Sequence, residues 1–143
     1  MVNEISKKSH IAMRKRYGWR FYENNNSREW FFGYQYNANI ENTLDKISLA
    51  LCNANTSDND ILNYIRNISG HFSMVVETSE WVVAAVDKIC TNPIFVVELE
   101  NDIFISNYAP ILKDKCDLDN SSLNLSAGLE GHMAGYTIGN KTL

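Results

Sequence analysis

Three cysteines and three histidines are the residues of this sequence that could bind a metal or form disulfides, and their spacing argues against both roles. The cysteines are odd in number and far apart, so they form neither a CxxC metal knuckle nor a disulfide framework: Cys52, Cys90 and Cys116. None of the histidines has a carboxylate at the spacing of an HExxH motif: His10, His71 and His132. We therefore expect hydrogen-bonded or solvated histidines, no metal, no cofactor and a reducing cytoplasm.

Three tryptophans are the next candidates, because a flat aromatic face can stack on a sugar or a base. Trp19, Trp30 and Trp81 all fall in segments that we predict to be strands. Aromatic residues on strands more often fill a core than a ligand site. We expect these three to pack inside.

The segments that must position such residues begin with a hairpin and two helices. Residues 17–23 and 29–37 are rich in Trp, Phe and Tyr, which favours strands, and the Asn-Ser run at 24–27 supplies turn chemistry. The first helix is predicted from apolar residues at helical spacing: Ile40, Leu44, Ile47 and Leu51. A second helix, capped by Ser57 or Asp58 and ended by Gly70, carries a similar set: Ile61, Leu62, Ile65 and Ile68.

After residue 70 the apolar pattern changes to period two. We predict a strand over 72–76, a turn at 77–80, and a strand over 81–87 whose nearly continuous apolar run suits burial on both faces. Strands over 94–98 and 103–106 follow, and we expect the four strands to form one antiparallel meander. The last predicted helices span 108–113 and 122–133. Two strand layers with helices outside make the predicted class α+β.

Length and charge narrow the function further. The chain has 143 residues, 45% of them hydrophobic, which fits a single globular domain over 1–143. A net charge of −4 with interleaved signs offers no basic face, so nucleic acid is not an expected partner. The polar first twenty residues carry no secretory signal, and we expect a solvated, partly frayed terminus. No stretch has the roughly 18 apolar residues of a membrane span, so a membrane is not expected either.

Several short motifs match one known domain in order and spacing, most of them between residues 58 and 143. They are T-S-D-N-D-I-L at 56–62, G-H-F-S-M at 70–74, A-V-D-K-I-C-T-N-P-I at 85–94, F-I-S-N-Y at 104–108 and A-G-Y-T-I-G-N-K-T-L at 134–143. They are similar to G-S-D-T-E-V-I-L, G-x-F-A-F, A-R-D-x-x-G-x-x-P-L, F-A-S-E-x and G-Y-x-x-G-x-x-T-L. The chain thus resembles the class II glutamine amidotransferase (glutaminase) domain of asparagine-synthetase-like proteins. Upstream, F-G-Y-Q-Y-N at 32–37 is similar to N-G-E-I-Y-N, and residues 1–30 diverge.

The resemblance implies a fold and a chemistry. The fold would be the αββα sandwich of N-terminal-nucleophile hydrolases, whole or incomplete, with mostly antiparallel sheets and flanking helices. The chemistry would be glutamine hydrolysis by a leading cysteine whose own α-amino group is the base. Met1 is followed here by Val2, which has no nucleophilic atom. Phe32 stands where the family has an oxyanion-stabilising Asn, and R-K-R-Y-G at 14–18 poorly replaces the substrate-binding R-G-P-D. We therefore expect no catalytic residue.

Gly33 and Asp58 match family positions that hold glutamine, so a vestigial amino-acid pocket is one interpretation. The other, which we favour, is that Asp58 caps a helix and Gly33 permits close backbone packing. Asp87 is likewise expected to be structural and to bond the backbone of the turn before Pro93.

Together these features predict a non-catalytic glutaminase-like domain that binds or supports a synthetase-type partner. The S-G-G-x-D-S loop of a synthetase is absent from the sequence. Two alternatives stay open: an enzyme with residual or altered hydrolase activity, and a module that binds a small amino acid. A homo-oligomer is also left open.

Overall fold

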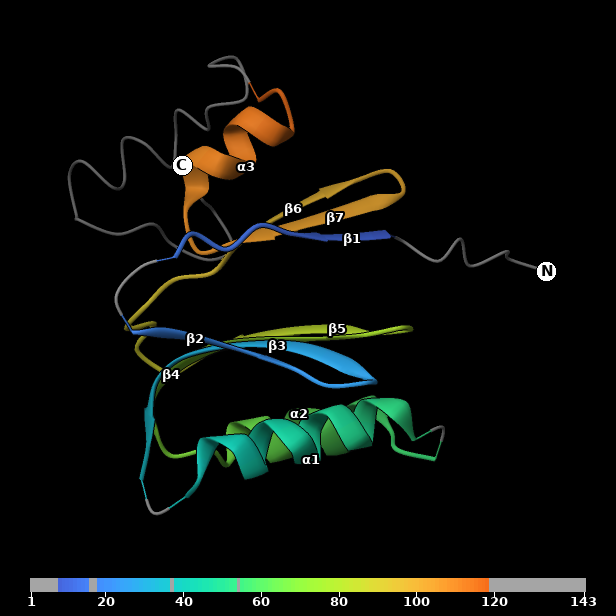
Figure 1. Ribbon diagram of the computed structural model, residues 1–143, viewed down its shortest axis with the longest axis vertical. Coiled ribbons are helices and arrows are strands. Elements are labelled where there is room, and N and C mark those ends of the chain that lie inside the picture. Colours follow the sequence, from blue (N-terminus) through green and yellow to red (C-terminus); the bar gives the residue numbers. More distant parts are fainter. Residues whose placement is uncertain (1–7, 16–17, 37, 54, 119–143) are drawn as a thin grey trace.

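The computed structural model describes residues 8–15, 18–36, 38–53 and 55–118, and every structural statement here refers to that part of the chain. It contains three helices and two mostly antiparallel sheets, which confirms the predicted α+β class. Figure 1 shows four layers. They are helix α3 (Ala109–Lys115), a three-stranded sheet, a four-stranded sheet, and the pair α1 (Ile40–Cys52) and α2 (Asp58–Arg66).

The four-stranded sheet is antiparallel throughout and has the order β2-β3-β4-β5. Its strands are β2 (Trp19–Glu23), β3 (Ser27–Gln35), β4 (Gly70–Thr78) and β5 (Val82–Val86). The predicted hairpin is confirmed as β2–β3. Its turn is closed by the side chain of Asn24, whose Oδ1 accepts the backbone N–H groups of Asn26 (2.9 Å) and Ser27 (2.8 Å).

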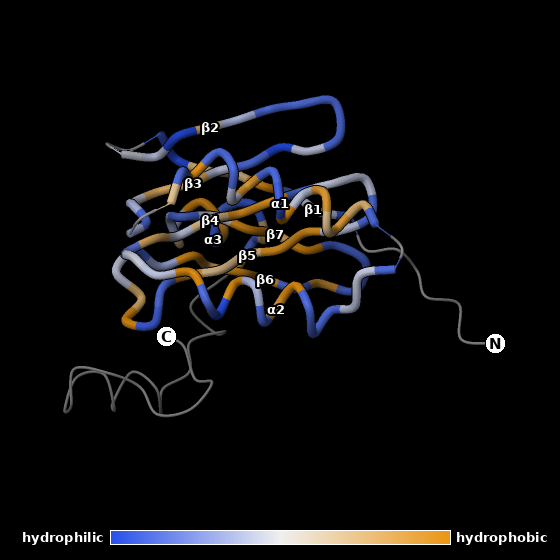
Figure 2. The backbone as a smooth tube through the Cα atoms, turned by 90° about the horizontal axis from the view of Figure 1, so that it is seen from below, coloured by the Kyte–Doolittle hydropathy of each residue, from blue (hydrophilic) through white to orange (hydrophobic). Residues whose placement is uncertain are grey.

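The hydrophobic core lies between this sheet and α1. Alternate residues of β3 and β4 point to the helices, and the apolar stripe predicted for α1 meets them. The buried cluster consists of Phe31, Leu44, Ile47, Leu51, Phe72, Met74 and Val76. Burying each such side chain stabilises the fold by about 1.5–3 kcal/mol. Figure 2 shows the hydrophobic stretches on the central strands and the largely hydrophilic β2 at the rim.

Side-chain caps fix where the two helices start. Asn39 precedes α1 and accepts the N–H of Glu41. Ser57 precedes α2 and forms a reciprocal capping box with Asp60. The prediction that Gly70 ends α2 is wrong, because the helix ends at Arg66 and Gly70 opens β4. A Cβ at Gly70 would lie 2.3 Å from the carbonyl oxygen of Tyr34, so glycine allows β3 and β4 to pair there.

The three-stranded sheet contains β1 (Lys8–Ile11), β7 (Asp102–Ser106) and β6 (Phe95–Leu99), in that order. β1 runs parallel to β7, and β6 runs antiparallel to it. A solvated, frayed terminus is therefore the wrong description of residues 8–11. Beyond β1, the Asn107 side chain holds Arg14 by accepting its N–H (2.8 Å) and donating to its carbonyl (2.9 Å).

The predicted single meander is also wrong. β4 and β5 form a hairpin in one sheet, and β6 and β7 form a hairpin in the other. The chain changes sheets through the loop that follows β5. β5 is an edge strand with half-buried residues and an exposed Ala84, so its apolar run does not reflect burial on both faces. The helix predicted over 108–113 is confirmed as α3, and the one over 122–133 lies outside the described residues.

Within the described ranges, no helix is long and apolar enough to cross a membrane.

Candidate functional site: a polar cavity between the sheets

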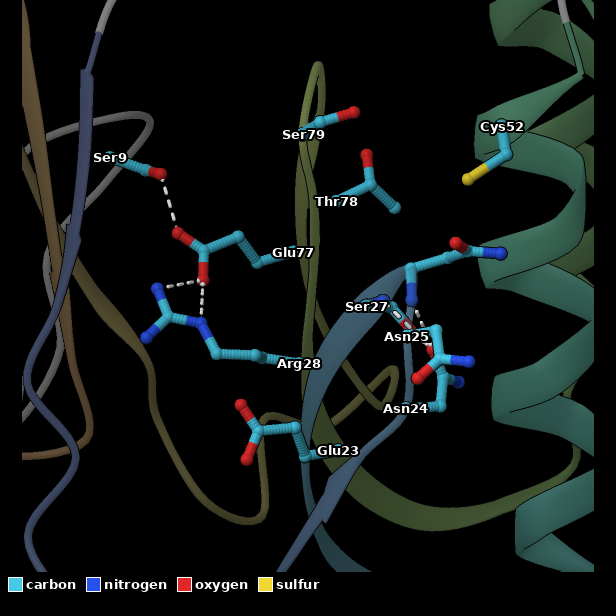
Figure 3. Close-up of a pocket in the computed structure, with 11 residues that line it drawn as sticks. Ser9, Glu23, Asn24, Asn25, Ser27, Arg28, Cys52, Glu77, Thr78 and Ser79 are labelled. Carbon is cyan, nitrogen blue, oxygen red and sulfur yellow. Dashed lines mark hydrogen bonds and ion pairs between the residues drawn. The ribbon is translucent and has the colours of Figure 1, made fainter.

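A cavity of about 640 Å³ opens at the end of the molecule where β1 begins. Five structural parts line it: Ser9 of β1, residues 23–28 of the β2–β3 hairpin, the last residue of α1, the end of β4, and Ser79 beyond it. Figure 3 shows these side chains around the opening, with Glu77 and Arg28 between β1 and the hairpin. All of the lining residues except Cys52 have polar side chains, which distinguishes the cavity from the apolar core.

Glu77 is the buried charge of this cavity. Arg28 donates to its Oε2 from Nε (2.7 Å) and from a terminal nitrogen (2.5 Å), and Ser9 donates its hydroxyl to Oε1 (2.6 Å). Arg28 and Glu77 are direct neighbours across the β3–β4 ladder, so strand register brings them together. The Ser9 bond joins β1 to β4 and thereby ties the two sheets.

This arrangement suits the binding of a charged ligand better than the activation of a hydroxyl nucleophile. Ser9 donates its hydroxyl proton to the Glu77 carboxylate, but Arg28 is already paired with that carboxylate at 2.5 Å. Glu23 lies opposite Arg28 on β2, and its carboxylate bonds to none of the described residues. The cavity therefore presents one uncommitted carboxylate and a half-exposed guanidinium on adjacent strands, a pair suited to a ligand with both charges.

Asp87 organises the loop between the sheets. Its buried carboxylate accepts the N–H groups of Phe72 (3.1 Å), Ile89 (3.0 Å) and Thr91 (3.2 Å). A hydrogen bond from the Thr91 side chain, together with these backbone donors, holds the pKa of Asp87 below its ordinary value against the opposing effect of desolvation. The structural role predicted for Asp87 is confirmed.

Both described histidines have partners. His10 stacks on Phe104 and places Nε2 2.7 Å from Oδ1 of Asp102. His71 places Nδ1 3.2 Å from the hydroxyl of Thr91. The interpretation of His10 and His71 as hydrogen-bonded side chains is confirmed, and His132 lies outside the described residues. Over the described ranges, no three His, Cys, Asp or Glu side chains gather as a metal site.

The cysteines are free thiols, and they differ in exposure. Cys52 and Cys90 are exposed, whereas burial raises the pKa of the half-buried Cys116 thiol. The tryptophans do not fill the core as predicted. Trp81 is exposed, and Trp19 and Trp30 are half-buried, because they lie on β2 and β3 and face away from the helices.

Gly33 is the seventh of the nine residues of β3 and lies opposite Phe72 of β4. Its φ is +101°, and a Cβ there would lie 2.0 Å from the carbonyl oxygen of His71. Its own carbonyl accepts a hydrogen bond from Arg20 (2.8 Å). The backbone at Gly33 is therefore packed and bonded on both sides.

Asp58 is the first residue of α2 and is exposed, and Ser57 supplies the cap. The other end of α2 lies near Gly33, because Ile65 and Arg66 share a cavity with Phe72, the strand partner of Gly33. The structure thus places Gly33 and Asp58 at opposite ends of α2, and the assignment of an amino-acid pocket to them stays a prediction. The matching positions at 1–7, 16–17, 37 and 134–143 lie outside the described residues.

Sequence reasoning missed the polar cavity. The turn predicted at 77–80 is wrong at Glu77, which lies within β4 and continues the alternation of His71, Ser73 and Val75. The signal in the sequence was that Glu77 falls on the same face of the strand as His71, Ser73 and Val75. Nothing in the sequence paired it with Arg28, which lies 49 positions away.

Comparison of the chain with protein-family models, curated proteins and solved structures finds no match.

Proposed function

We propose that this chain is a non-catalytic glutaminase-like domain, with the αββα fold of N-terminal-nucleophile hydrolases, that binds or supports a synthetase-type partner. The layer order in Figure 1, helix, sheet, sheet and helix pair, supports the fold assignment. The described motifs also fall at element boundaries. Residues 56–62 include the start of α2, residues 85–94 include the end of β5 and the crossing loop between the sheets, and residues 104–108 include the end of β7.

The environment of Phe32 is the observation that carries the non-catalytic assignment. Phe32 occupies the position where the resemblance requires an amide donor for an oxyanion. Its ring packs at 5.8 Å on Trp19, and a Cβ at Gly18 would lie 2.8 Å from it. An aromatic side chain held in this way donates no hydrogen bond, and the loss of one such donor lowers the rate by about 10²–10³.

Exposed aromatic side chains of the β2–β3 region support a binding role. Phe21, Tyr34 and Tyr36 are each about half exposed, at 52%, 49% and 53%. Tyr34 and Tyr36 meet edge to face at 5.5 Å. Aromatic residues are enriched at the centres of protein interfaces, and truncating one there often costs more than 1 kcal/mol of binding energy.

Copurification with a synthetase-type protein that carries the S-G-G-x-D-S loop tests the proposal. We expect stable association, weakened at least about ten-fold by Phe21→Ala combined with Tyr36→Ala. Leu49→Ala is the matched control, because Leu49 is also exposed and apolar but lies on α1. A monodisperse monomer that ignores the synthetase contradicts the partner role. Ammonia release from glutamine above the buffer rate contradicts the non-catalytic assignment.

The cavity favours a second candidate function, the binding of a free amino acid. Glu23 would take the α-ammonium group and Arg28 the carboxylate. At millimolar glutamine, glutamate or aspartate, the thermal midpoint should rise, since a ligand that binds only the folded state stabilises it by RT ln(1 + [L]/Kd). Glu23→Gln should abolish the rise without unfolding the protein, because Glu23 is exposed. An unmoved midpoint in the wild type rejects this function.

A further inference from the structure

A second cavity, of about 370 Å³, lies beside the end of α2, and its lining is mainly apolar. The start of β4, the end of β5 and the first residues of the crossing loop complete its wall. Five of its residues have hydrocarbon side chains: Ile65, Ile68, Phe72, Val86 and Ile89. Sites for small molecules typically have volumes of about 300–1,000 Å³ and an apolar lining with a few polar groups. This cavity has both properties, and it shares none of its described residues with the polar cavity.

Two cations without a carboxylate partner line the same cavity. Arg66 ends α2 and Lys88 lies in the crossing loop, and both are exposed. Neither forms an ion pair with a described residue. The acidic residue of the lining, Asp87, is buried and already accepts three backbone N–H groups. The described part of the cavity therefore offers a ligand positive charge that no neighbouring carboxylate neutralises.

The loop that carries Lys88 is held in place by its own hydrogen bonds. The Asp87 carboxylate accepts the N–H groups of Ile89 (3.0 Å) and Thr91 (3.2 Å). The Asp87 carbonyl also accepts the N–H of Cys90 (3.0 Å). Ile89 is nevertheless 72% exposed, the largest exposed fraction among the large apolar side chains of the described residues. The loop thus presents an apolar side chain and a cation next to each other at the cavity, and such pre-organisation reduces the entropy cost of binding.

We propose that this cavity binds a small carboxylic acid whose remaining part is hydrocarbon. The carboxylate would pair with Arg66 and Lys88, since both side chains donate strong charge-assisted hydrogen bonds to such a group. The hydrocarbon part would cover the apolar wall and Ile89, because removing apolar surface from water is favourable. An ammonium group against that wall would lose its water without gaining a partner, which favours a simple monoanion over an amino acid. The site goes beyond the proposed function, and neither depends on the other.

Isothermal titration calorimetry of the full chain with hexanoate, heptanoate and octanoate tests this proposal. Octanoate should bind with a dissociation constant of roughly millimolar order or below. Each added methylene that is buried should strengthen binding about three- to four-fold. Octylamine, which has the opposite charge, should bind at least about ten-fold more weakly than octanoate. In amide NMR spectra, octanoate should shift resonances of residues 65–72 and 86–89 and leave those of residues 23–28 and 77–79 unchanged.

Substitutions in the lining separate the contribution of charge from that of apolar contact. Arg66→Gln and Lys88→Gln should each weaken octanoate binding about five- to ten-fold, and both proteins should fold because these side chains are exposed. Ile89→Glu should weaken it at least as much, because it puts a carboxylate where the hydrocarbon part of the ligand lies. Lys46→Gln is the matched control. Lys46 is an exposed lysine of α1 outside this cavity, so the same loss of charge should leave the affinity unchanged.

Each of four outcomes overturns the proposal. One is the absence of saturable octanoate binding at millimolar concentration, and a second is an affinity that does not rise with chain length. A third is unchanged binding in both glutamine variants, which would leave Arg66 to complement only the carbonyl end of α2. A fourth is a set of NMR shifts confined to the polar cavity.

Circular dichroism identifies a variant that fails to fold, and the wild-type chain-length series and NMR shifts then decide the question alone. None of these measurements depends on glutamine hydrolysis or on association with a synthetase. Failure of this proposal is therefore distinguishable from failure of the proposed function.

Discussion

Substitution of Gly33 by alanine tests whether this residue is structural. Its φ of +101° lies in a region that L residues rarely adopt, which costs about 1–3 kcal/mol. The new Cβ would lie 2.0 Å from the His71 carbonyl oxygen, and forcing β3 and β4 apart adds about 1–3 kcal/mol. Alanine also lowers the conformational entropy of the unfolded chain, which offsets about 0.4–1 kcal/mol of this loss of stability. We expect a net loss of about 3 kcal/mol in the free energy of unfolding.

Gly18 provides the matched comparison, because its φ of +92° is similar but its obstacle is different. A Cβ there would meet the Phe32 ring at 2.8 Å, and a side chain can move where a paired backbone cannot. Gly18→Ala should therefore cost only about 1 kcal/mol.

Urea unfolding followed by tryptophan fluorescence and circular dichroism measures both losses. A total stability of about 5–15 kcal/mol leaves both variants folded in buffer. The reasoning is refuted if Gly33→Ala lies within about 0.5 kcal/mol of the wild type, or if Gly18→Ala is the more damaging change. A Gly33→Ala protein of normal stability that loses affinity for an amino acid would instead support a ligand site there.

Three further expectations follow from the caps, the crossing loop and the thiols. Ser57→Ala removes the capping box of α2 and should cost about 1 kcal/mol in urea unfolding, whereas Ser57→Thr, which keeps the hydroxyl that donates to Asp60, should change little. The lowered pKa of Asp87 means that its carboxylate stabilises the fold above the unfolded-state pKa of about 3.9, and that this stabilisation is lost as pH falls through the lower folded-state value. Between pH 5 and pH 2 the wild type should thus lose more stability than Asp87→Asn, and parallel losses would contradict this. A disulfide reagent at neutral pH should label Cys52 and Cys90 before Cys116, whose thiol pKa is raised by burial, and equal rates in the folded protein would count against that order.

Local features were predictable because their causes are local. The Asn-rich turn bonds its own backbone, and the stripe from Ile40 to Leu51 repeats every three or four residues, so both could be placed within one or two residues. Asp87 could be assigned to a turn because its donors include residues two and four positions ahead of it.

The partner of each strand could not be predicted in the same way. β4 to β7 look like consecutive strands of one sheet, and no residue marks the change of sheet between Val86 and Phe95. β1 was missed because Lys8–Ile11 has no strong alternation and is stabilised by β7, almost a hundred residues later. The Arg28–Glu77 pair depends on the same long-range register, so the polar cavity was missed with it.

The position of Asp58 follows from the short connection between α1 and α2. α1 has 13 residues, about 20 Å at 1.5 Å each, and it runs from the end of β3 to the β2–β3 turn. The next residues form a turn in which Thr56 donates to the carbonyl of Asn53 (2.9 Å), so the chain does not return along α1 before α2 starts. Asp58 therefore lies at the end of α2 away from the strand pair of Gly33 and Phe72, and an amino-acid pocket shared by Gly33 and Asp58 stays a prediction.

The same connection brings the start of α2 towards the polar cavity. Cys52, the last residue of α1, lines that cavity, and α2 begins six positions later. Glu23, whose carboxylate bonds to none of the described residues, lies there beside the exposed guanidinium of Arg28, which also pairs with Glu77. The backbone of Gly33, in contrast, is closed by Arg20 and His71. If this chain binds an amino acid at all, its affinity should therefore depend on Glu23 and be insensitive to Asp58→Asn.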